Sequence, residues 1–143
     1  MAAASKDREA LRKENPDEIE YALNAGAKLW KGTLAFFANG TGGLIPARTG
    51  TAGDLFAGVP IQRYDNSGGA LGDVIGIVYK RGSFVFNMAT PPTIALNGQP
   101  AYAVDDSTVT ASSTGAVQVG TFVFDRDLAS RNLVRVNVAG AVK

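Results

Sequence analysis

The chain has 143 residues, 45% of them hydrophobic, and a formal net charge of +1, so it fits one folded domain with no bulk attraction to nucleic acid. It contains no cysteine and no histidine, which excludes disulfides, thiolate nucleophiles, zinc–sulfur sites and histidine-dependent catalysis but leaves carboxylate and lysine chemistry open. No apolar run reaches the roughly 18 residues of a membrane span, and the first residues lack the apolar segment of a secretory signal, so we expect a soluble protein made in the cytoplasm.

The first twenty residues are rich in charge. They hold ten of the 27 charged side chains and all four glutamates of the chain. Residues 5–14 could form a short helix that stops at Pro16, but Leu11 is its only large apolar side chain, so it has almost no face to bury. We therefore expect residues 1–26 to form an extended charged arm and residues 27–143 to form the folded body.

From residue 27 the pattern is that of short strands separated by Gly, Asn and Asp turns. In chain order, strands are predicted within residues 28–37, 44–47 (an edge strand, because of Pro46), 56–64, 73–79, 84–86, 101–104, 108–110, 117–124 and 133–138. Residues 80–83 read as a tight hairpin between two of these strands, and no helix is predicted beyond residue 20. The predicted fold is all-β: a small antiparallel sandwich or barrel, jelly-roll-like, with the extended N-terminal arm.

The glycine-rich stretch of residues 63–73 joins two of the apolar strands. Phosphate-binding loops need a helix directly behind the glycines. Here a β-branched run begins at Val74, so a structural turn is favoured over nucleotide binding.

Two pairs of carboxylates stand out in the body, Asp105 with Asp106 and Asp125 with Asp127. A calcium loop needs more oxygen ligands at alternating positions, and a hydrolase would need two carboxyls facing each other across a cleft. Turn capping explains both pairs more simply. We therefore expect no metal, no cofactor and no catalytic residue.

Trp30 and the apolar strand at residues 117–124 are either core or an interface with another chain, and core is favoured for both. A basic patch is the other surface possibility. Its candidate members are Lys80, Arg81, Arg63, Arg131 and Arg135. The basic surplus of the body is only three charges, which is too small to favour nucleic-acid binding.

Taken together, these segments resemble the small cement, or head-decoration, proteins of tailed bacteriophages, particularly those of Mu-like phages and prophages. The likeness rests on residues 5–8 (SKDR), 27–34 (AKLWKGTL), 56–59 (FAGV), 64–70 (YDNSGGA), 79–86 (YKRGSFVF), 101–109 (AYAVDDSTV), 117–120 (VQVG) and a closing valine strand at 134–138. Two departures from the family pattern are Gln62-Arg63-Tyr64, where an acidic residue is usual, and the tail at residues 139–143.

The resemblance implies a non-enzymatic protein of the virion that binds the outer surface of the assembled capsid. It would bridge neighbouring major capsid protein subunits, stabilise the shell against internal DNA pressure, and associate with itself as a homodimer or homotrimer, with no nucleic-acid or membrane partner. The arm residues expected to bind the capsid are Lys6, Asp7, Arg8, Arg12, Lys13 and Tyr21. The loop and interface candidates are Trp30, Arg63, Tyr64, Asp65, Asn66, Lys80 and Arg81.

Two other classes stay open. One is a receptor- or glycan-binding module of a phage fibre or tail, which would need an exposed aromatic platform on the loops. The other is a hydrolase that uses the aspartates named above.

Overall fold

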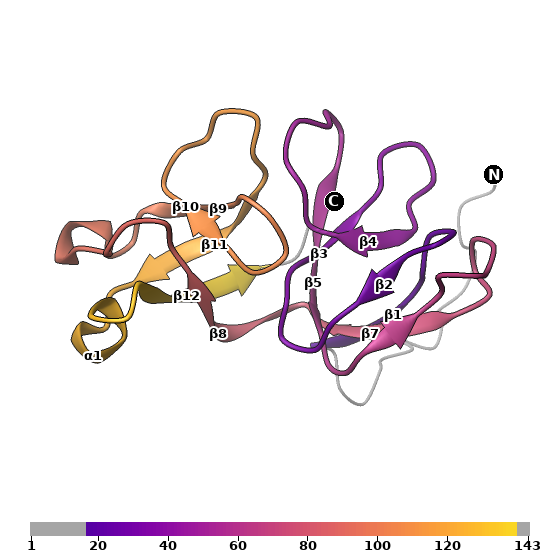
Figure 1. The fold of residues 1–143 in the computed structure, drawn as a ribbon, viewed down its shortest axis with the longest axis horizontal. Helices are drawn as coiled ribbons and strands as arrows, with labels where there is room; N and C mark the ends of the chain where they lie inside the picture. The colour runs from indigo at the N-terminus through magenta and orange to yellow at the C-terminus, as the bar shows by residue number, and fades with distance from the viewer. Residues whose placement is uncertain (1–16, 140–143) are drawn as a thin grey trace, which may run out of the picture.

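A computed structural model describes residues 17–139, and nearly all of their regular structure is β-strand (Figure 1). The strands are β1 (Glu18–Ala22), β2 (Lys28–Leu29), β3 (Ala35–Phe37), β4 (Leu44–Pro46), β5 (Leu55–Pro60), β6 (Tyr64–Asp65), β7 (Ile75–Tyr79), β8 (Arg81–Asn87), β9 (Pro100–Ala103), β10 (Val109–Thr110), β11 (Gln118–Val123) and β12 (Leu133–Ala139). Helix in this part of the chain is limited to the 3-10 turn η1 (Ile94–Leu96) and the single turn α1 (Arg126–Ala129). The predicted all-β class is confirmed. No helix among these residues is long and apolar enough to cross a membrane.

The strands form two antiparallel five-stranded sheets and one small ribbon. The first sheet has the order β1-β7-β5-β3-β4, the second has the order β10-β9-β11-β12-β8, and the ribbon pairs β2 with β6. Figure 1 shows the first sheet on the right and the second on the left, so each sheet is built from one half of the chain. One cluster of buried apolar side chains runs through both sheets. This arrangement agrees with the predicted sandwich, and neither described sheet closes into a barrel.

The first sheet curls until its two edge strands meet at one point. Leu23, just after β1, makes an isolated parallel bridge to Leu44 of β4. Both side chains are fully buried. Tyr21 of β1 also packs edge-to-face against Phe37 of β3, with ring centroids 4.7 Å apart. The curl buries the concave face of the sheet without any helix to cover it.

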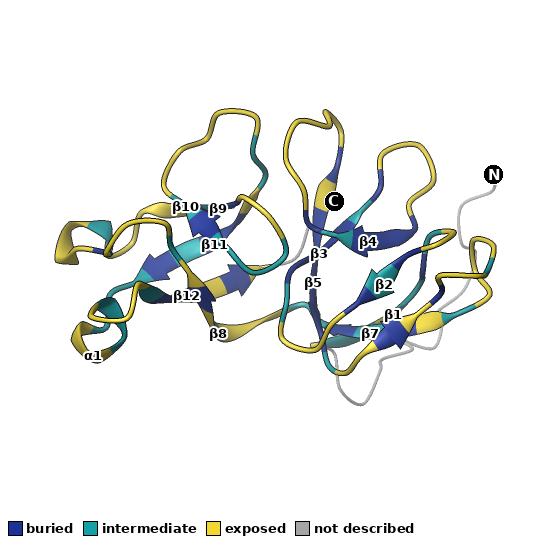
Figure 2. Ribbon diagram, viewed as in Figure 1, coloured by how far each residue is buried: buried dark blue, intermediate teal, exposed yellow. Residues whose placement is uncertain are grey.

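The second sheet follows the alternation that the sequence predicts. Val134, Val136 and Val138 of β12 are buried, whereas Asn137, between the last two, is exposed. Figure 2 shows buried and exposed positions side by side along β12. In β11 the pairing with β9 shifts between Gln118 and Gly120. This bulge explains how Val119 and Phe122, three residues apart, are both fully buried. The core interpretation of the strand at residues 117–124 is therefore correct.

The hairpin predicted at residues 80–83 is wrong. β7 ends at Tyr79 in the first sheet, and β8 begins at Arg81 in the second, where it pairs with β12 from Leu133↔Asn87 to Ala139↔Arg81. The chain thus crosses between sheets at Lys80. The central residues of a two-residue hairpin at 80–83 would be Arg81 and Gly82, and the primed turns need a positive φ at the first of them. Gly82 has a positive φ, but Arg81 does not.

The expected arm also differs from the structure over its second half. β1 pairs with β7 along five residues, from Glu18↔Tyr79 to Ala22↔Ile75, and Leu23 is part of the core. Glutamates at positions 18 and 20 suggest a solvated segment, but the alternating Ile19, Tyr21 and Leu23 give this stretch apolar side chains to bury. Residues 17–26 therefore belong to the body. Residues 1–16, which carry the rest of the expected arm, lie outside the described residues.

Candidate docking surface

The ribbon of β2 and β6 carries a group of exposed side chains on one face. Its register pairs Lys28 with Asp65 and Leu29 with Tyr64. Because side chains alternate along a strand, Leu29 and Tyr64 point to the core, where both are buried. Continuing the register by one step places Trp30 opposite Arg63. Lys28, Trp30, Arg63 and Asp65 therefore share the outer face, and we call them the Trp30 surface.

Trp30 is the centre of this surface. It is the only tryptophan of the chain, and 45% of its surface is exposed, so the core interpretation made from the sequence is wrong for this residue. Two cations lie over its ring: Lys28 Nζ is 4.8 Å and Arg63 Cζ is 4.7 Å from the ring centroid. Each such contact in an exposed setting is worth about 0.5–1 kcal/mol. The pair holds the indole in one orientation.

The backbone around Trp30 is also fixed. The Trp30 carbonyl accepts a hydrogen bond from the Thr33 hydroxyl at 2.7 Å, and the Gly32 amide donates to the Pro60 carbonyl at 3.2 Å. This tight turn ties the end of β2 to β5 of the first sheet. A large aromatic side chain is thus exposed on a rigid support.

Asp65 balances part of the positive charge. Its carboxylate lies 3.8 Å from Arg63 Nη2 and accepts hydrogen bonds from the Ser67 hydroxyl and the Ser67 amide. These hydrogen bonds, and then the charges of Lys28 and Arg63, hold the pKa of Asp65 below its usual range. The carboxylate stays ionised at neutral pH, and the surface keeps one surplus positive charge.

A glycine-rich loop behind β6 holds the ribbon in place. The side-chain amide of Asn66, which is only 3% exposed, donates to the carbonyls of Asn24 at 2.9 Å and Ala70 at 3.0 Å. The Asn66 backbone amide donates to the Ala27 carbonyl at 2.8 Å. Asn66 therefore ties the loop to the backbone at Asn24, Ala27 and Ala70. The loop is a structural turn, as the sequence analysis favoured. The role of Asn66 is to support the ribbon, because its side-chain and backbone amides donate hydrogen bonds within the fold.

The other residues predicted for the interface lie elsewhere. Tyr64 is buried under the ribbon, and no described residue bonds to its hydroxyl group. Tyr21 packs within the first sheet, where burial raises its pKa. Lys80 and Arg81 lie at the crossing between sheets, where Arg81 Nε is 3.2 Å from Asp17 Oδ1. The predicted arm residues Lys6, Asp7, Arg8, Arg12 and Lys13 lie outside the described part of the chain.

One aspartate of each pair caps a turn. Asp125 Oδ1 accepts the amides of Asp127 and Leu128 and so caps α1. Asp105 Oδ1 accepts the amides of Ser107 and Thr108 in the turn between β9 and β10. No group of three or more potential metal-binding side chains occurs among residues 17–139. Turn capping, the simplest of the three interpretations, accounts for the contacts of Asp105 and Asp125.

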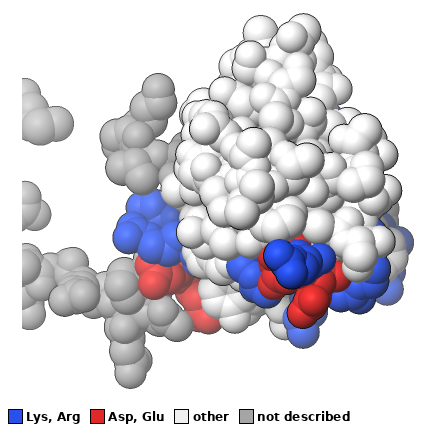
Figure 3. Space-filling model, turned by 90° about the vertical axis from the view of Figure 1, so that its left-hand side faces the viewer, with Lys and Arg blue, Asp and Glu red and all other residues white. Residues whose placement is uncertain are grey.

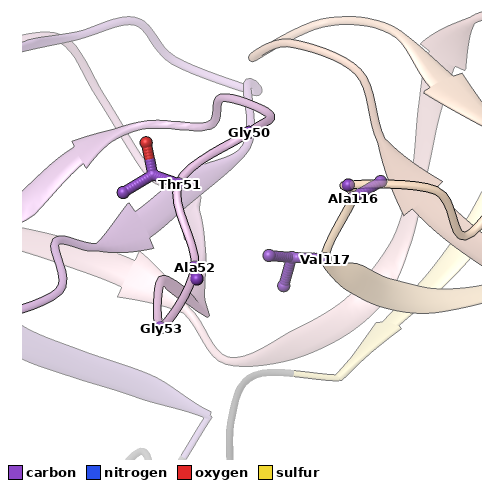
Figure 4. Close-up of a pocket in the computed structure, with 7 residues that line it drawn as sticks. Gly50, Thr51, Ala52, Gly53, Ala116 and Val117 are labelled. Atoms are coloured by element: carbon purple, nitrogen blue, oxygen red, sulfur yellow. The ribbon is translucent and has the colours of Figure 1, made fainter.

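A pocket of about 320 Å³ lies where the two halves of the chain meet. The loop before β5 lines one side and the loop before β11 lines the other, and Figure 4 shows Ala52 and Val117 facing each other across it. The lining residues are Gly50, Thr51, Ala52, Gly53, Gly115, Ala116 and Val117. None of them has an ionisable side chain, so the pocket supplies no acid or base to a bound molecule.

The charged side chains on the end of the molecule formed by the second sheet lie along one edge. In Figure 3 lysines, arginines and acidic residues are mixed along the lower part of this face, and its upper part carries none. The uncharged part agrees with the sequence, where residues 107–124 hold no charged residue. A nucleic-acid backbone needs a continuous basic stripe, and the described atoms on this face do not form one.

Sequence reasoning missed Lys28 as a member of the Trp30 surface. The signal was present, because Lys28 and Trp30 are two residues apart and so lie on one face of a strand. Arg63 and Asp65 have the same spacing. What could not be seen was that these two short strands, about 35 residues apart in the chain, pair with each other. A comparison of the chain with protein-family models, with curated proteins and with solved structures gave no match.

Proposed function

We propose that this chain is a head-decoration protein of a tailed bacteriophage. It binds the outer surface of the assembled capsid, bridges neighbouring subunits of the major capsid protein, and stabilises the shell against internal DNA pressure. The ordered sequence likeness described above suggests the class. The observation that carries the proposal is the exposed Trp30 held on a rigid ribbon, because a fixed, exposed tryptophan is a typical anchor of a protein–protein interface.

The energy available from this anchor is considerable. An exposed fraction of 45% on a side chain of roughly 250 Å² leaves roughly 110 Å² for a partner to cover. At about 25 cal/mol per Å², covering it contributes about 3 kcal/mol, or about a hundredfold in affinity. Little of this is lost to ordering the side chain, since Lys28 and Arg63 already hold the ring.

Many copies on one capsid multiply such modest contacts. When several sites are linked through a shared shell, each further contact forms at a high effective concentration. A decoration protein therefore needs no deep pocket and no catalytic group. The surplus positive charge of the Trp30 surface favours an acidic patch on the capsid partner.

The test uses capsid shells assembled from the major capsid protein of the phage that encodes this chain. We expect the wild-type protein to co-sediment with the shells, and we expect Trp30→Ala to bind about 10- to 100-fold more weakly. Ile94→Ala is the matched control, because Ile94 is a large apolar residue that is 71% exposed in η1. Since Trp30 is the only tryptophan, its emission should also shift to shorter wavelength when shells are added. Unchanged binding by Trp30→Ala, together with unchanged emission, would contradict the proposal.

A glycan-binding module is the second candidate, because an exposed aromatic ring is also what a sugar stacks on. Two cations already lie over the ring of Trp30, which leaves less of it for a sugar. The capsid interaction is therefore favoured. Binding to a glycan array that is lost in Trp30→Ala, with no affinity for shells, would reverse this preference.

A further inference from the structure

The long edge strand β8 has a side that is free along most of its length, because a described residue pairs with it there only at Asn87, through a single parallel bridge to Thr108. β8 is the last strand of the second sheet, and β12 is the one named strand that pairs with it among the described residues. The amide of Met88 donates to Asn132, on the side of β12, while the amide of Asn87 donates to Ser107 on the opposite side. Successive residues of a strand point their amides in opposite directions. The backbone groups of Arg81, Ser83 and Val85 therefore point away from β12, as those of Asn87 do.

The other three edge strands of the two five-stranded sheets carry features that discourage pairing with another chain. β1 has two glutamates, Glu18 and Glu20. β4 has only three residues and ends at Pro46, and β10 has only two residues. β8 has seven residues, no proline, no lysine, and a single charge at its first position. The long edge from Arg81 to Val85 is therefore a template on which a strand of another chain can pair.

The pattern of the free edge is self-complementary. When two copies of β8 are laid antiparallel about a two-fold axis at Ser83, Ser83 faces Ser83 and Arg81 faces Val85 of the other copy. Arg81, Ser83 and Val85 of each strand then lie in hydrogen-bonded pairs. Arg81, the one charged residue of β8, faces Val85 of the other copy, and Val85 is 39% exposed in the isolated chain. The two copies of Arg81 lie at opposite ends of the interface. No like charges meet.

We propose that β8 pairs with β8 of a second copy, so that two five-stranded sheets become one continuous ten-stranded sheet. This is a symmetric interface in which each copy uses the same surface. We expect β8 of a second copy, rather than the N-terminal residues of the chain, to pair with the free side of β8. Residues 1–16 are rich in charged residues and alanine, and such sequences are poor strand formers. The inference does not depend on the capsid-binding function, because it uses only the geometry of the second sheet.

Light scattering on the full chain, over a concentration series, tests the proposal. We expect twice the mass of one chain for the wild type and for the control Ser83→Thr. We expect the mass of one chain for Ser83→Lys, in which two lysines face each other across the axis. A wild type that stays a single chain at every concentration would overturn the proposal, and so would a dimer that persists in Ser83→Lys.

A second measurement does not depend on how well the lysine variant folds. The chain has no cysteine, so Ser83→Cys introduces one thiol, and the proposed register places it beside its copy. We expect Ser83→Cys to form a disulfide-linked dimer quickly under mild oxidation. The matched control is Ser113→Cys in the exposed loop before β11. Disulfide formation at Ser83 that is no faster than at Ser113 would overturn the proposal.

Discussion

Two adjacent glycines in the loop behind β6 should respond in opposite ways to the same substitution. A Cβ atom added to Gly68 meets nothing within 4 Å, and the residue has no positive φ angle. A Cβ added to Gly69 collides with Asn66 Oδ1 and also lies 3.1 Å from Asn66 Cγ and 3.2 Å from Asp73 Cβ. The Asn66 side chain cannot move away cheaply, because it is buried and both of its amide hydrogen bonds are in use.

The size of the effect follows from those two hydrogen bonds. Displacing the Asn66 side chain breaks both of them and leaves its buried amide group without partners, which costs about 2–3 kcal/mol. For a chain of this length we expect Gly69→Ala to lower the melting temperature by about 6–10 °C. Gly68→Ala should be neutral or more stable by about 0.5 kcal/mol, because alanine reduces the freedom of the unfolded chain.

Thermal unfolding followed by circular dichroism measures both variants, and a double mutant tests the cause. If Gly69→Ala acts by displacing Asn66, then adding it to Asn66→Ala should cost little more than Asn66→Ala alone. Equal stability of Gly68→Ala and Gly69→Ala would refute the reasoning. So would additive losses in the double mutant.

Three further substitutions test the packing and the charges, each by thermal unfolding. Tyr64→Phe should keep or raise stability, by up to about 1 kcal/mol, since no described group bonds to the buried hydroxyl; a clear loss would show that the hydroxyl has a partner. Asp54→Asn should cost about 1–3 kcal/mol at neutral pH, because the carboxylate is buried and bonded to Arg48 Nε at 2.7 Å. That bond lowers the Asp54 pKa, so the ionised carboxylate stabilises the fold at pH values above the ordinary pKa of aspartate. This stabilisation is lost as the pH falls through the pKa of Asp54 in the folded protein. A loss of stability in Asp54→Asn that is the same at every pH would contradict this. Burial, and after it the negative charge of Asp105, raise the pKa of Asp106. Ionisation of Asp106 therefore destabilises the fold as the pH rises. Asp106→Asn removes this charge, so it should raise the melting temperature at neutral pH but not in acid.

The parts of the fold that depend on local patterns could be predicted from the sequence. The alternating valines of β12 predict both the strand and its buried face, because side chains of a single strand point alternately to opposite sides of the sheet. Pro46 placed β4 at an edge, since proline cannot donate in the middle of a sheet. Asp125 was expected to cap a turn, and it caps α1.

The parts that depend on distant partners could not be predicted. The sequence around Lys80 looks like a turn, but β8 pairs with β12, about fifty residues further along. For Trp30 the sequence leaves core and interface open and favours the core, because large aromatic side chains usually are buried. Its exposure follows from the pairing of Leu29 with Tyr64, which puts both of those side chains inside and turns Trp30 out. No local pattern shows that pairing.

The most direct test of the proposed function is an electron-microscopy density map of the tailed-phage particles on which the proposal places this chain. We predict copies of the β-sheet body on the outside of the head, at symmetric positions that span neighbouring capsid subunits, with the ring of Trp30 covered by a capsid subunit. A head that carries no copies of the chain, or copies whose Trp30 surface faces the solvent, would contradict the proposal.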